Sequence, residues 1–491
     1  MKKNKLKIVH IIIIIVGLIF VSLSAFHKNL WFDETYSVAL ASHSFKEIWQ
    51  IGGNDVHPIL YYWILHIAYL LFGNNIIIFR NFSVICIFQL AIIGYTHIRK
   101  DFGDRIGIVF SYLSYFLPVM CIYAVEVRMY AFAALLTVLL AIYAYRLLKE
   151  NTKKNWTIFA MCSLALSYTH YYGLMTAGII NIALFVYSIR KVKEDDTYMK
   201  RFVTQAIIEM ILYVPWIIYF AVQLQHVGGG FWVKVAFPDT LINIINFQYK
   251  GFADIGFSYT LDNMLPFIFA VVLYIYIGYL IYNEVKQKKD IKPGIMALSI
   301  YLSVIIAAAL ISIFISILFC RYIFVITGLL IFAISYFLVK EKKKVITFVI
   351  LAIMAVMSIN NQYKLIKENY AESNLKQIEY ISQMILPDDI IIYSDVIGES
   401  ILPIYFPENK QYFINLEKWD VKEAYKAYGP QMETIEDLDF LKDFKGRIWI
   451  AESGESKLYK EIENADIIMD SKEFNTAYHG YYHNIMLIEK K

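Results

Sequence analysis

The 491-residue chain has few charged residues and few cysteines for its length. Only 18% of its residues are charged, whereas about a quarter is usual in globular domains, so an ordinary soluble protein is excluded. The four cysteines lie in or beside apolar runs and are not clustered, which argues against a disulfide framework and a cysteine metal site. A Walker A loop and a dinucleotide fingerprint are also missing, which argues against cytoplasmic nucleotide chemistry.

Apolar side chains dominate the sequence instead. They make up 58% of the residues, so lipid is the main solvent expected for the chain. The first apolar run, 8–26, follows a basic N-terminus and has no convincing cleavage site, so we interpret it as an uncleaved helix. Runs of spanning length predict about 11 transmembrane helices, at 8–26, 76–98, 106–125, 129–148, 156–172, 173–189, 203–222, 263–283, 294–318, 322–339 and 345–358.

One further apolar run, 59–72, is too short to span. As a helix it would measure roughly 21 Å, against a hydrocarbon core of ~30 Å. Pro58 before it and Gly73 after it are typical of the start and the end of a helix. We therefore expect a juxtamembrane helix at the interface, within a first outer loop at 27–75.

The positions of Lys and Arg agree with this topology. The N-terminus and the loops near 99–105, 146–154, 190–201, 284–292 and 340–344 hold 24 of them, and the opposite loops hold seven. Because cytoplasmic loops are rich in Lys and Arg, the N-terminus is predicted inside and the C-terminus outside a cell membrane, which is expected to be bacterial.

The region 359–491 has a different composition. Charges return, and short apolar runs predict strands at 390–393, 411–415, 447–451, 467–469 and 484–488. We expect a polytopic α-helical membrane domain, 1–358, followed by a small extracytoplasmic α/β domain, 359–491.

Five polar clusters fall on the predicted outer side. They are Trp31-Phe32-Asp33-Glu34, Asn54-Asp55-Val56-His57-Pro58, Glu126-Val127-Arg128-Met129-Tyr130, His170-Tyr171-Tyr172-Gly173 and Cys320-Arg321-Tyr322. Ionisable groups at the membrane edge are costly, so several of both signs on one side predict a shared site.

Each cluster alone has a structural alternative. Acidic residues such as Asp33, Glu34 and Asp55 are common at helix N-termini. An interfacial arginine often extends to lipid headgroups, which applies to Arg128 and Arg321. His170 with its neighbouring tyrosines fits an aromatic belt.

The chemistry of the clusters favours a lipid-linked phosphate substrate. A guanidinium group can donate two parallel hydrogen bonds to the oxygens of one phosphate, and it remains charged when partly desolvated. Carboxylates suit a general base or a divalent cation. With a phosphate as the leaving group no general acid is needed, so one carboxylate can deprotonate an acceptor hydroxyl while the arginines neutralise the departing phosphate.

Four of these strings resemble the GT-C superfamily of membrane glycosyltransferases. They are Trp31-Phe32-Asp33-Glu34-Thr35-Tyr36, the run from Asp55 to Tyr62, Glu126-Val127-Arg128-Met129-Tyr130-Ala131 and His170-Tyr171-Tyr172. The nearest resemblance is to bacterial members of the dolichyl-phosphate-mannose protein mannosyltransferase group, in which such motifs occur in the same order. This group includes the lipid A aminoarabinose transferase. The resemblance covers roughly residues 8–340. One departure is His57-Pro58-Ile59-Leu60, where the family usually has His-Pro-Pro-Leu.

The resemblance implies an inverting hexosyl or pentosyl transferase that uses a polyprenyl-phosphate sugar. It makes Asp33 the candidate base, with Glu34 and Asp55 as further catalytic candidates. The substrate-binding candidates are His57, Glu126, Arg128, Tyr130, His170, Tyr171 and Arg321. Some relatives bind a divalent metal and others need none, so metal use is left open, with Asp33, Asp55 and His57 as candidate ligands.

The expected partners are the polyprenyl-phosphate-sugar donor, the bilayer and an extracytoplasmic acceptor, which is a protein, a glycolipid or a cell-wall polymer; no nucleic acid is expected. The rival interpretation is a transporter or flippase of a lipid-linked sugar. Transporters tend to have repeated halves and charges near the bilayer midplane, whereas most charges here lie at one edge.

Overall fold

The computed structural model describes residues 2–228, 233–252, 257–394, 399–415, 425–429, 432–453, 458, 462 and 467–490. The chain forms two compact units. The first comprises Met1–Ala25, Val56–Tyr61 and Arg80–Tyr363, and the second comprises Phe26–Asp55, Tyr62–Phe79 and Lys364–Lys491. The sequence predicts a single boundary at residue 358. In the structure, most of the predicted first outer loop belongs instead to the same compact unit as the C-terminal region.

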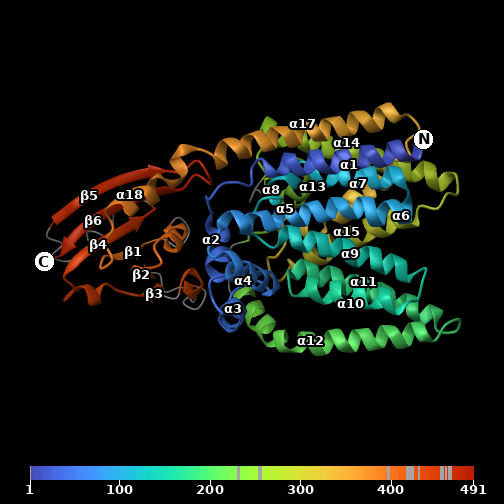
Figure 1. The fold of residues 1–491 in the computed structure, drawn as a ribbon. Helices are drawn as coiled ribbons and strands as arrows, with labels where there is room; N and C mark the ends of the chain where they lie inside the picture. Colours follow the sequence, from blue (N-terminus) through green and yellow to red (C-terminus); the bar gives the residue numbers. More distant parts are fainter. Residues whose placement is uncertain are drawn as a thin grey trace. The chain divides into compact units, whose positions relative to one another are not determined.

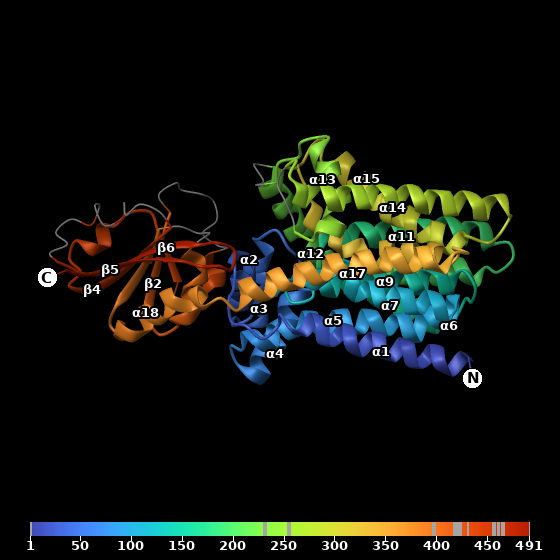
Figure 2. The same cartoon turned by 90° about the horizontal axis from the view of Figure 1, so that it is seen from above.

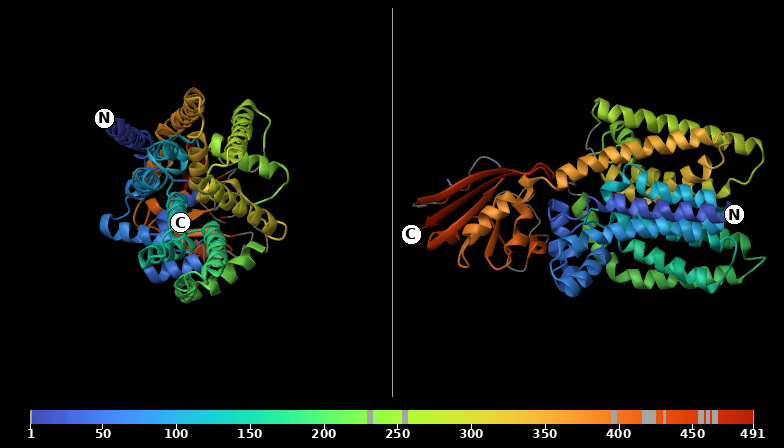
Figure 3. Two further views of the ribbon diagram at one scale, coloured as in Figure 1. Left: turned by 90° about the vertical axis from the view of Figure 1, so that its right-hand side faces the viewer. Right: turned by 45° about the horizontal axis from the view of Figure 1, so that its top comes forward.

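The first unit is built from helices that run side by side (Figures 1 and 2) and appear end-on in the left view of Figure 3. They are α1 (Lys2–Ser22), α5 (Ile76–Ile93), η1 (Gly94–Ile98), α6 (Arg99–Phe102), α7 (Asp104–Phe116), α8 (Met120–Tyr123), α9 (Tyr130–Leu147), α10 (Lys153–Ser167), α11 (Tyr171–Lys191), α12 (Thr197–Gly228), α13 (Asp239–Lys250), α14 (Leu261–Lys286), α15 (Lys292–Ile311), η2 (Cys320–Ile326), α16 (Thr327–Leu338) and α17 (Lys344–Asn369).

Nine helices within the described residues are long and apolar enough to cross a membrane. Two of the expected spans, 106–125 and 156–172, form shorter helices instead. The first is α7, with 13 residues, and the second is α10, with 15. α7 stops at Phe116 because Pro118 disfavours helical geometry at Leu117, whose backbone is extended. The last expected span is longer than predicted, since α17 runs on to Asn369.

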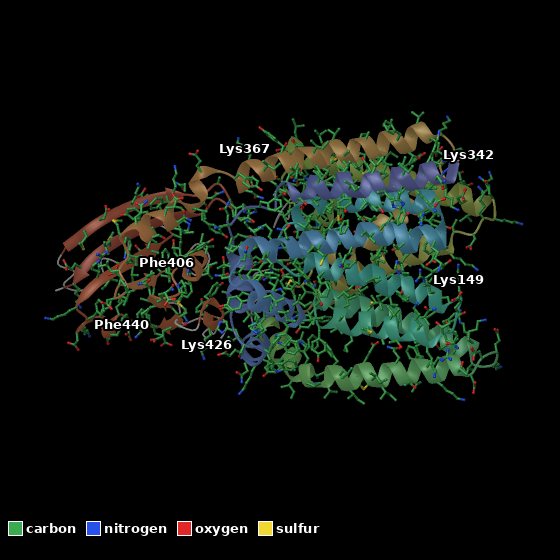
Figure 4. The ribbon with its side chains drawn as sticks, in the orientation of Figure 1. Lys149, Lys342, Lys367, Phe406, Lys426 and Phe440 are labelled. Carbon is green, nitrogen blue, oxygen red and sulfur yellow. The ribbon has the colours of Figure 1, made fainter. Side chains whose placement is uncertain are left out.

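The lysines of two loops predicted to lie inside share one end of this unit. Lys149 and Lys342 are labelled in Figure 4 at the end where Figure 1 places the N-terminus. This arrangement is the one that the distribution of Lys and Arg predicts.

The second unit contains the juxtamembrane helices and a sheet. Its helical segments are α2 (Phe32–Leu40), α3 (Phe45–Gly53), α4 (Leu60–Phe72), α18 (Lys376–Met384) and the short turns η3 (Glu372–Leu375), η4 (Glu399–Ile401), η5 (Pro403–Tyr405), η6 (Lys426–Tyr428) and η7 (Asp439–Leu441). The 13 residues of α4 confirm a helix too short to span, although it starts at Leu60 rather than beside Pro58. It ends before Gly73, whose φ of +67° suits a glycine.

The sheet has six strands in the order β3-β2-β1-β4-β6-β5. They are β1 (Ile390–Tyr393), β2 (Lys410–Ile414), β3 (Met432–Ile435), β4 (Gly446–Glu452), β5 (Ile467–Asn475) and β6 (Tyr482–Lys490). β1 pairs in parallel with β2 and β4, and β6 is antiparallel to β4 and β5. The five strands predicted from the sequence are confirmed. β3 was missed because it is a short edge strand that carries Glu433 and Thr434.

Helix α18 covers one face of this sheet (Figure 2). Its Tyr380 contacts the rings of Trp449 on β4 and Phe474 on β5. Isoleucines such as Ile390, Ile448 and Ile488 form a hydrophobic core. The prediction of an α/β domain is confirmed.

Candidate functional site

The second unit holds a carboxylate cluster formed by Asp33 and Asp55. Asp33 lies in the first turn of α2, and Asp55 follows α3, whose C-cap is Asn54. Two buried tyrosines face these acids: Tyr428 interacts electrostatically with both, and Tyr36 interacts with Asp55. The two tyrosine rings contact each other with centroids 6.1 Å apart.

Both tyrosines remain protonated. Burial raises the pKa of Tyr36 and of Tyr428 well above 10, and the nearby carboxylates raise it further, although a hydrogen bond with Ser400 partly opposes this at Tyr428. Each hydroxyl is therefore a hydrogen-bond donor beside the acids.

Helix capping does not account for the acids. The N-cap of α2 is Trp31, whose side chain makes no capping hydrogen bond. Asp33 and Glu34 are in the first turn, where the helix dipole favours a negative charge, but neither occupies the cap position. Asp55 does not cap α4, which begins only at Leu60.

Glu34 has a different environment from Asp33. Its side chain is fully buried and accepts a hydrogen bond of 2.9 Å from the hydroxyl of Tyr478, in the turn between β5 and β6. This contact joins α2 to the C-terminal sheet. The geometry therefore gives Glu34 an anchoring role.

Neighbouring residues strengthen this anchor. The Trp31 indole stacks on the His479 ring at 4.7 Å, and the backbone amide of Phe32 donates to the Tyr481 hydroxyl at 3.1 Å. α2 also packs against the short turns η4, η5 and η6. The C-terminal region thus positions the helix that carries Asp33.

We expect Tyr478→Phe to destabilise the second unit by about 1–3 kcal/mol, because the buried Glu34 carboxylate loses a hydroxyl donor. Thermal unfolding of the detergent-solubilised protein measures this. Tyr482→Phe, a partly exposed position on β6, is the matched control and should leave the midpoint within about 0.5 kcal/mol of wild type. Equal effects of the two variants would contradict the anchoring role.

The first unit holds a basic cluster formed by His57, Arg128 and His170. A guanidinium nitrogen of Arg128 lies 3.4 Å from Nε2 of His57, and because guanidinium only donates, that nitrogen of His57 is the acceptor. The rings of His57 and His170 are 6.2 Å apart. Arg128 and His170 are each only 3% exposed.

The protonation state of His170 follows from its contacts. His170 is the N-cap of α11, and its Nδ1 accepts a hydrogen bond from the amide of Tyr172. Burial lowers its pKa well below 6.5, and His57 and Arg128 lower it further, so the ring is neutral. Its proton is then on Nε2, a buried donor without a hydrogen-bond partner in the described part of the chain.

The other predicted binding residues are distributed around this cluster. Tyr130 contacts the His170 ring at 5.6 Å, and Tyr322, the neighbour of Arg321, contacts it at 5.5 Å. Arg321 lies over the ring of Phe319 and, like Glu126, interacts electrostatically with the buried Tyr123. The geometry therefore brings the 126–130, 170 and 320–322 segments together.

Tyr171 is the exception among them. Its hydroxyl donates to Gln223 and accepts from the indole nitrogen of Trp216, both on α12. Its described hydrogen bonds are therefore made with α12 and not with the ring of His170.

Several contributing residues were not predicted from the sequence. Arg80, fully buried within an apolar run, donates to the backbone oxygen of Val125 at 2.6 Å, and Ser83 donates to that of Glu126 at 2.5 Å. The presence of Arg80 inside a predicted span is the feature of the sequence from which its contact with the 125–126 segment could have been predicted. Tyr428 and Tyr478 had none, because the chain contains 39 tyrosines.

The metal hypothesis has two carboxylates in its favour. Asp33 and Asp55 act on the same tyrosine, so they could bind a cation together. Within the described residues, no group of three or more His, Cys, Asp or Glu side chains is arranged to hold a metal ion. The third candidate, His57, belongs to the other unit and faces Arg128.

Comparison with known proteins agrees with this picture. Residues 56–219 match the family model described as dolichyl-phosphate-mannose-protein mannosyltransferase. The fold is similar to that of ArnT from Cupriavidus metallidurans bound to undecaprenyl phosphate, with a TM-score of 0.61, 12% identity and coverage of 98% of this chain and 97% of that one. The apo state of that protein gives the same TM-score and identity, with 97% of each chain covered. No curated protein matches the sequence.

The chain therefore has a fold similar to that of ArnT, and residues 56–219 match the mannosyltransferase family model. The multi-pass helical architecture with a small C-terminal sheet domain is confirmed for the residues that the structure describes. The resemblance recognised from the four short motifs is confirmed as well. The family match at 56–219 includes three of these motifs, except that it begins one residue after Asp55.

Proposed function

We propose that the protein is an inverting glycosyltransferase, which moves a sugar from a polyprenyl-phosphate donor to an acceptor outside the cytoplasm. One observation carries this proposal. Asp55 and His57 are two positions apart in the chain, so their Cα atoms are at most ~7 Å apart. The turn 55–57 therefore joins the two clusters along the chain, which supports the proposal that one substrate uses both a base and phosphate-binding groups.

The basic cluster suits the donor phosphate. Arg128 provides two or more parallel N–H donors, and the Nε2–H of neutral His170 provides another. Arg321 adds a second guanidinium, held near Tyr322, which contacts His170. These donors stabilise the negative charge that develops on the leaving phosphate.

The carboxylate cluster suits the acceptor. Asp33 takes the proton of the acceptor hydroxyl while that oxygen attacks the anomeric carbon from the face opposite the phosphate. The bond from the anomeric carbon to the phosphate oxygen breaks, and the phosphate leaves as an anion that needs no proton. Asp55 and the protonated Tyr428, which interacts with both acids, help to orient Asp33, and Tyr36 interacts with Asp55.

A divalent cation bound by Asp33 and Asp55 remains part of the proposal. It would supply positive charge near the sugar phosphate. Transfer measured with and without a chelator, followed by addition of Mg²⁺ or Mn²⁺, decides whether such a cation takes part.

The experiment that tests the function is a reconstituted transfer assay. Purified protein in liposomes that contain a polyprenyl-phosphate sugar should release the lipid phosphate and glycosylate an acceptor from a membrane extract. Movement of the lipid-linked sugar between leaflets without product formation would instead support the transporter interpretation. Glycan and lipid profiles of cells with and without the gene then identify the sugar and the acceptor.

Topology provides a separate prediction. Cysteines introduced at Lys342 and Glu408, both exposed, should react with a membrane-impermeant maleimide from opposite sides of the membrane. The four native cysteines are buried and give little background. Labelling of both positions from the same side would exclude an extracytoplasmic C-terminal domain combined with a cytoplasmic 340–344 loop.

A further inference from the structure

A cavity of about 280 Å³ lies inside the first unit, within the bundle of apolar helices. Its walls are formed by residues of α9, α11, α15 and α16, among them Val138, Ala141, Ile180, Met296 and Phe332. Among the described residues that line it, Arg190 is the only charged one.

The cavity lies away from the basic cluster. Along α11 its lining runs from Ile180 to Arg190, which is ~15 Å of helix, and His170 at the start of α11 is ~30 Å from Arg190. Along α9 the lining runs from Val138 to Leu148, at the end of the unit where Lys149 is labelled in Figure 4. The cavity is therefore not part of the site already described.

Arg190 differs from the basic residues around it. Arg146 is paired with Asp101 at 2.8 Å, and Lys191 with Glu194 at 2.5 Å. Arg190 is exposed and makes no ion pair with any residue that the structure describes. The Tyr187 hydroxyl beside it already donates to the backbone oxygen of Leu148. One end of the cavity thus carries an uncompensated positive charge.

We propose that this cavity binds an acyl chain of an anionic membrane phospholipid, whose phosphate is held by Arg190. An apolar cavity does not retain water, so an aliphatic chain is the occupant that its walls favour. A guanidinium group binds phosphate well, and basic pockets between transmembrane helices on the cytoplasmic side select anionic headgroups. Lysines 149, 191 and 193 at the same end favour this leaflet.

Native mass spectrometry of the full-length protein, extracted from membranes in mild detergent, tests the proposal. Wild type should retain about one phospholipid per chain, enriched in anionic classes. Arg190→Gln should lower that enrichment about fivefold, because one positive charge near the lipid surface is removed. Lys191→Gln, the adjacent and already paired cation, is the control and should retain the wild-type pattern.

A second variant separates the chain from the headgroup. Ala141→Phe fills the cavity and should abolish lipid retention regardless of headgroup; Ala183→Phe replaces it if the first variant does not unfold cooperatively. Retention of the same lipids by all variants would overturn the proposal. The proposal would also be overturned if Ala141→Phe removed only bound polyprenyl phosphate and no phospholipid, because the cavity would then bind the donor. The amount of retained lipid and its headgroup class are measured without any transfer activity. A failure of this proposal can therefore be distinguished from a failure of the proposed function.

Discussion

Asp33→Asn should lower the turnover number by about 10³-fold while the protein still inserts and folds, because a general base contributes roughly 10²–10⁴-fold to a proton-transfer step. The amide has nearly the same shape as the carboxylate but cannot accept the acceptor's proton. The donor should still bind, since its phosphate is assigned to the basic cluster. The change is therefore expected in kcat and not in the KM for the donor, measured in the reconstituted assay.

Two companion variants make this result interpretable. Asp437→Asn, at an exposed position beside the sheet, should have full activity. Asp55→Asn should have a smaller effect than Asp33→Asn, since Asp55 is assigned an orienting role next to Tyr36. If Asp55→Asn abolishes transfer and Asp33→Asn does not, the base has been assigned to the wrong acid.

Arg128→Gln should reduce kcat/KM for the polyprenyl-phosphate sugar roughly 100-fold, since it removes charge-assisted hydrogen bonds to the donor phosphate. Arg128→Lys should recover only part of this loss, because an ammonium group retains the charge but not the paired donors. Competition by free polyprenyl phosphate measures the binding component directly, and its inhibition constant should rise in both variants.

Arg105→Gln is the control for a general effect of charge removal. Arg105 is exposed at the start of α7 and outside both clusters, so this variant should behave as wild type. Unchanged inhibition of Arg128→Gln by polyprenyl phosphate would show that the arginine serves another purpose, such as fixing His57.

The sequence indicated the charged residues of the two candidate clusters more completely than the residues that support them. Asp33, Arg128 and His170 were recognisable because ionisable side chains at the edge of apolar runs are costly to maintain. Tyr428 and Tyr478 were not, because tyrosine is common in this chain and the contacts bridge hundreds of residues. No local pattern indicates that Glu34 would pair with a turn of the sheet.

The same distinction holds for the fold. Hydrophobic runs and the distribution of Lys and Arg predicted most helices and kept 59–72 out of the spanning set, because both depend on local composition. The length of α7 depends on where Pro118 interrupts the helix, and the runs alone did not show this. The grouping of α2 with the C-terminal sheet depends on long-range packing, which periodicity does not reveal.

The bond between Glu34 and Tyr478 also sets an order of events during synthesis. Its two partners are 444 residues apart, and β6, the last strand in the chain, lies between β4 and β5 in the sheet. At roughly 5–20 residues per second, Glu34 emerges from the ribosome some 20–90 seconds before its partner. Throughout that interval α2 lacks its anchor, so the helix that carries Asp33 is fixed only after every described membrane-spanning helix has been made.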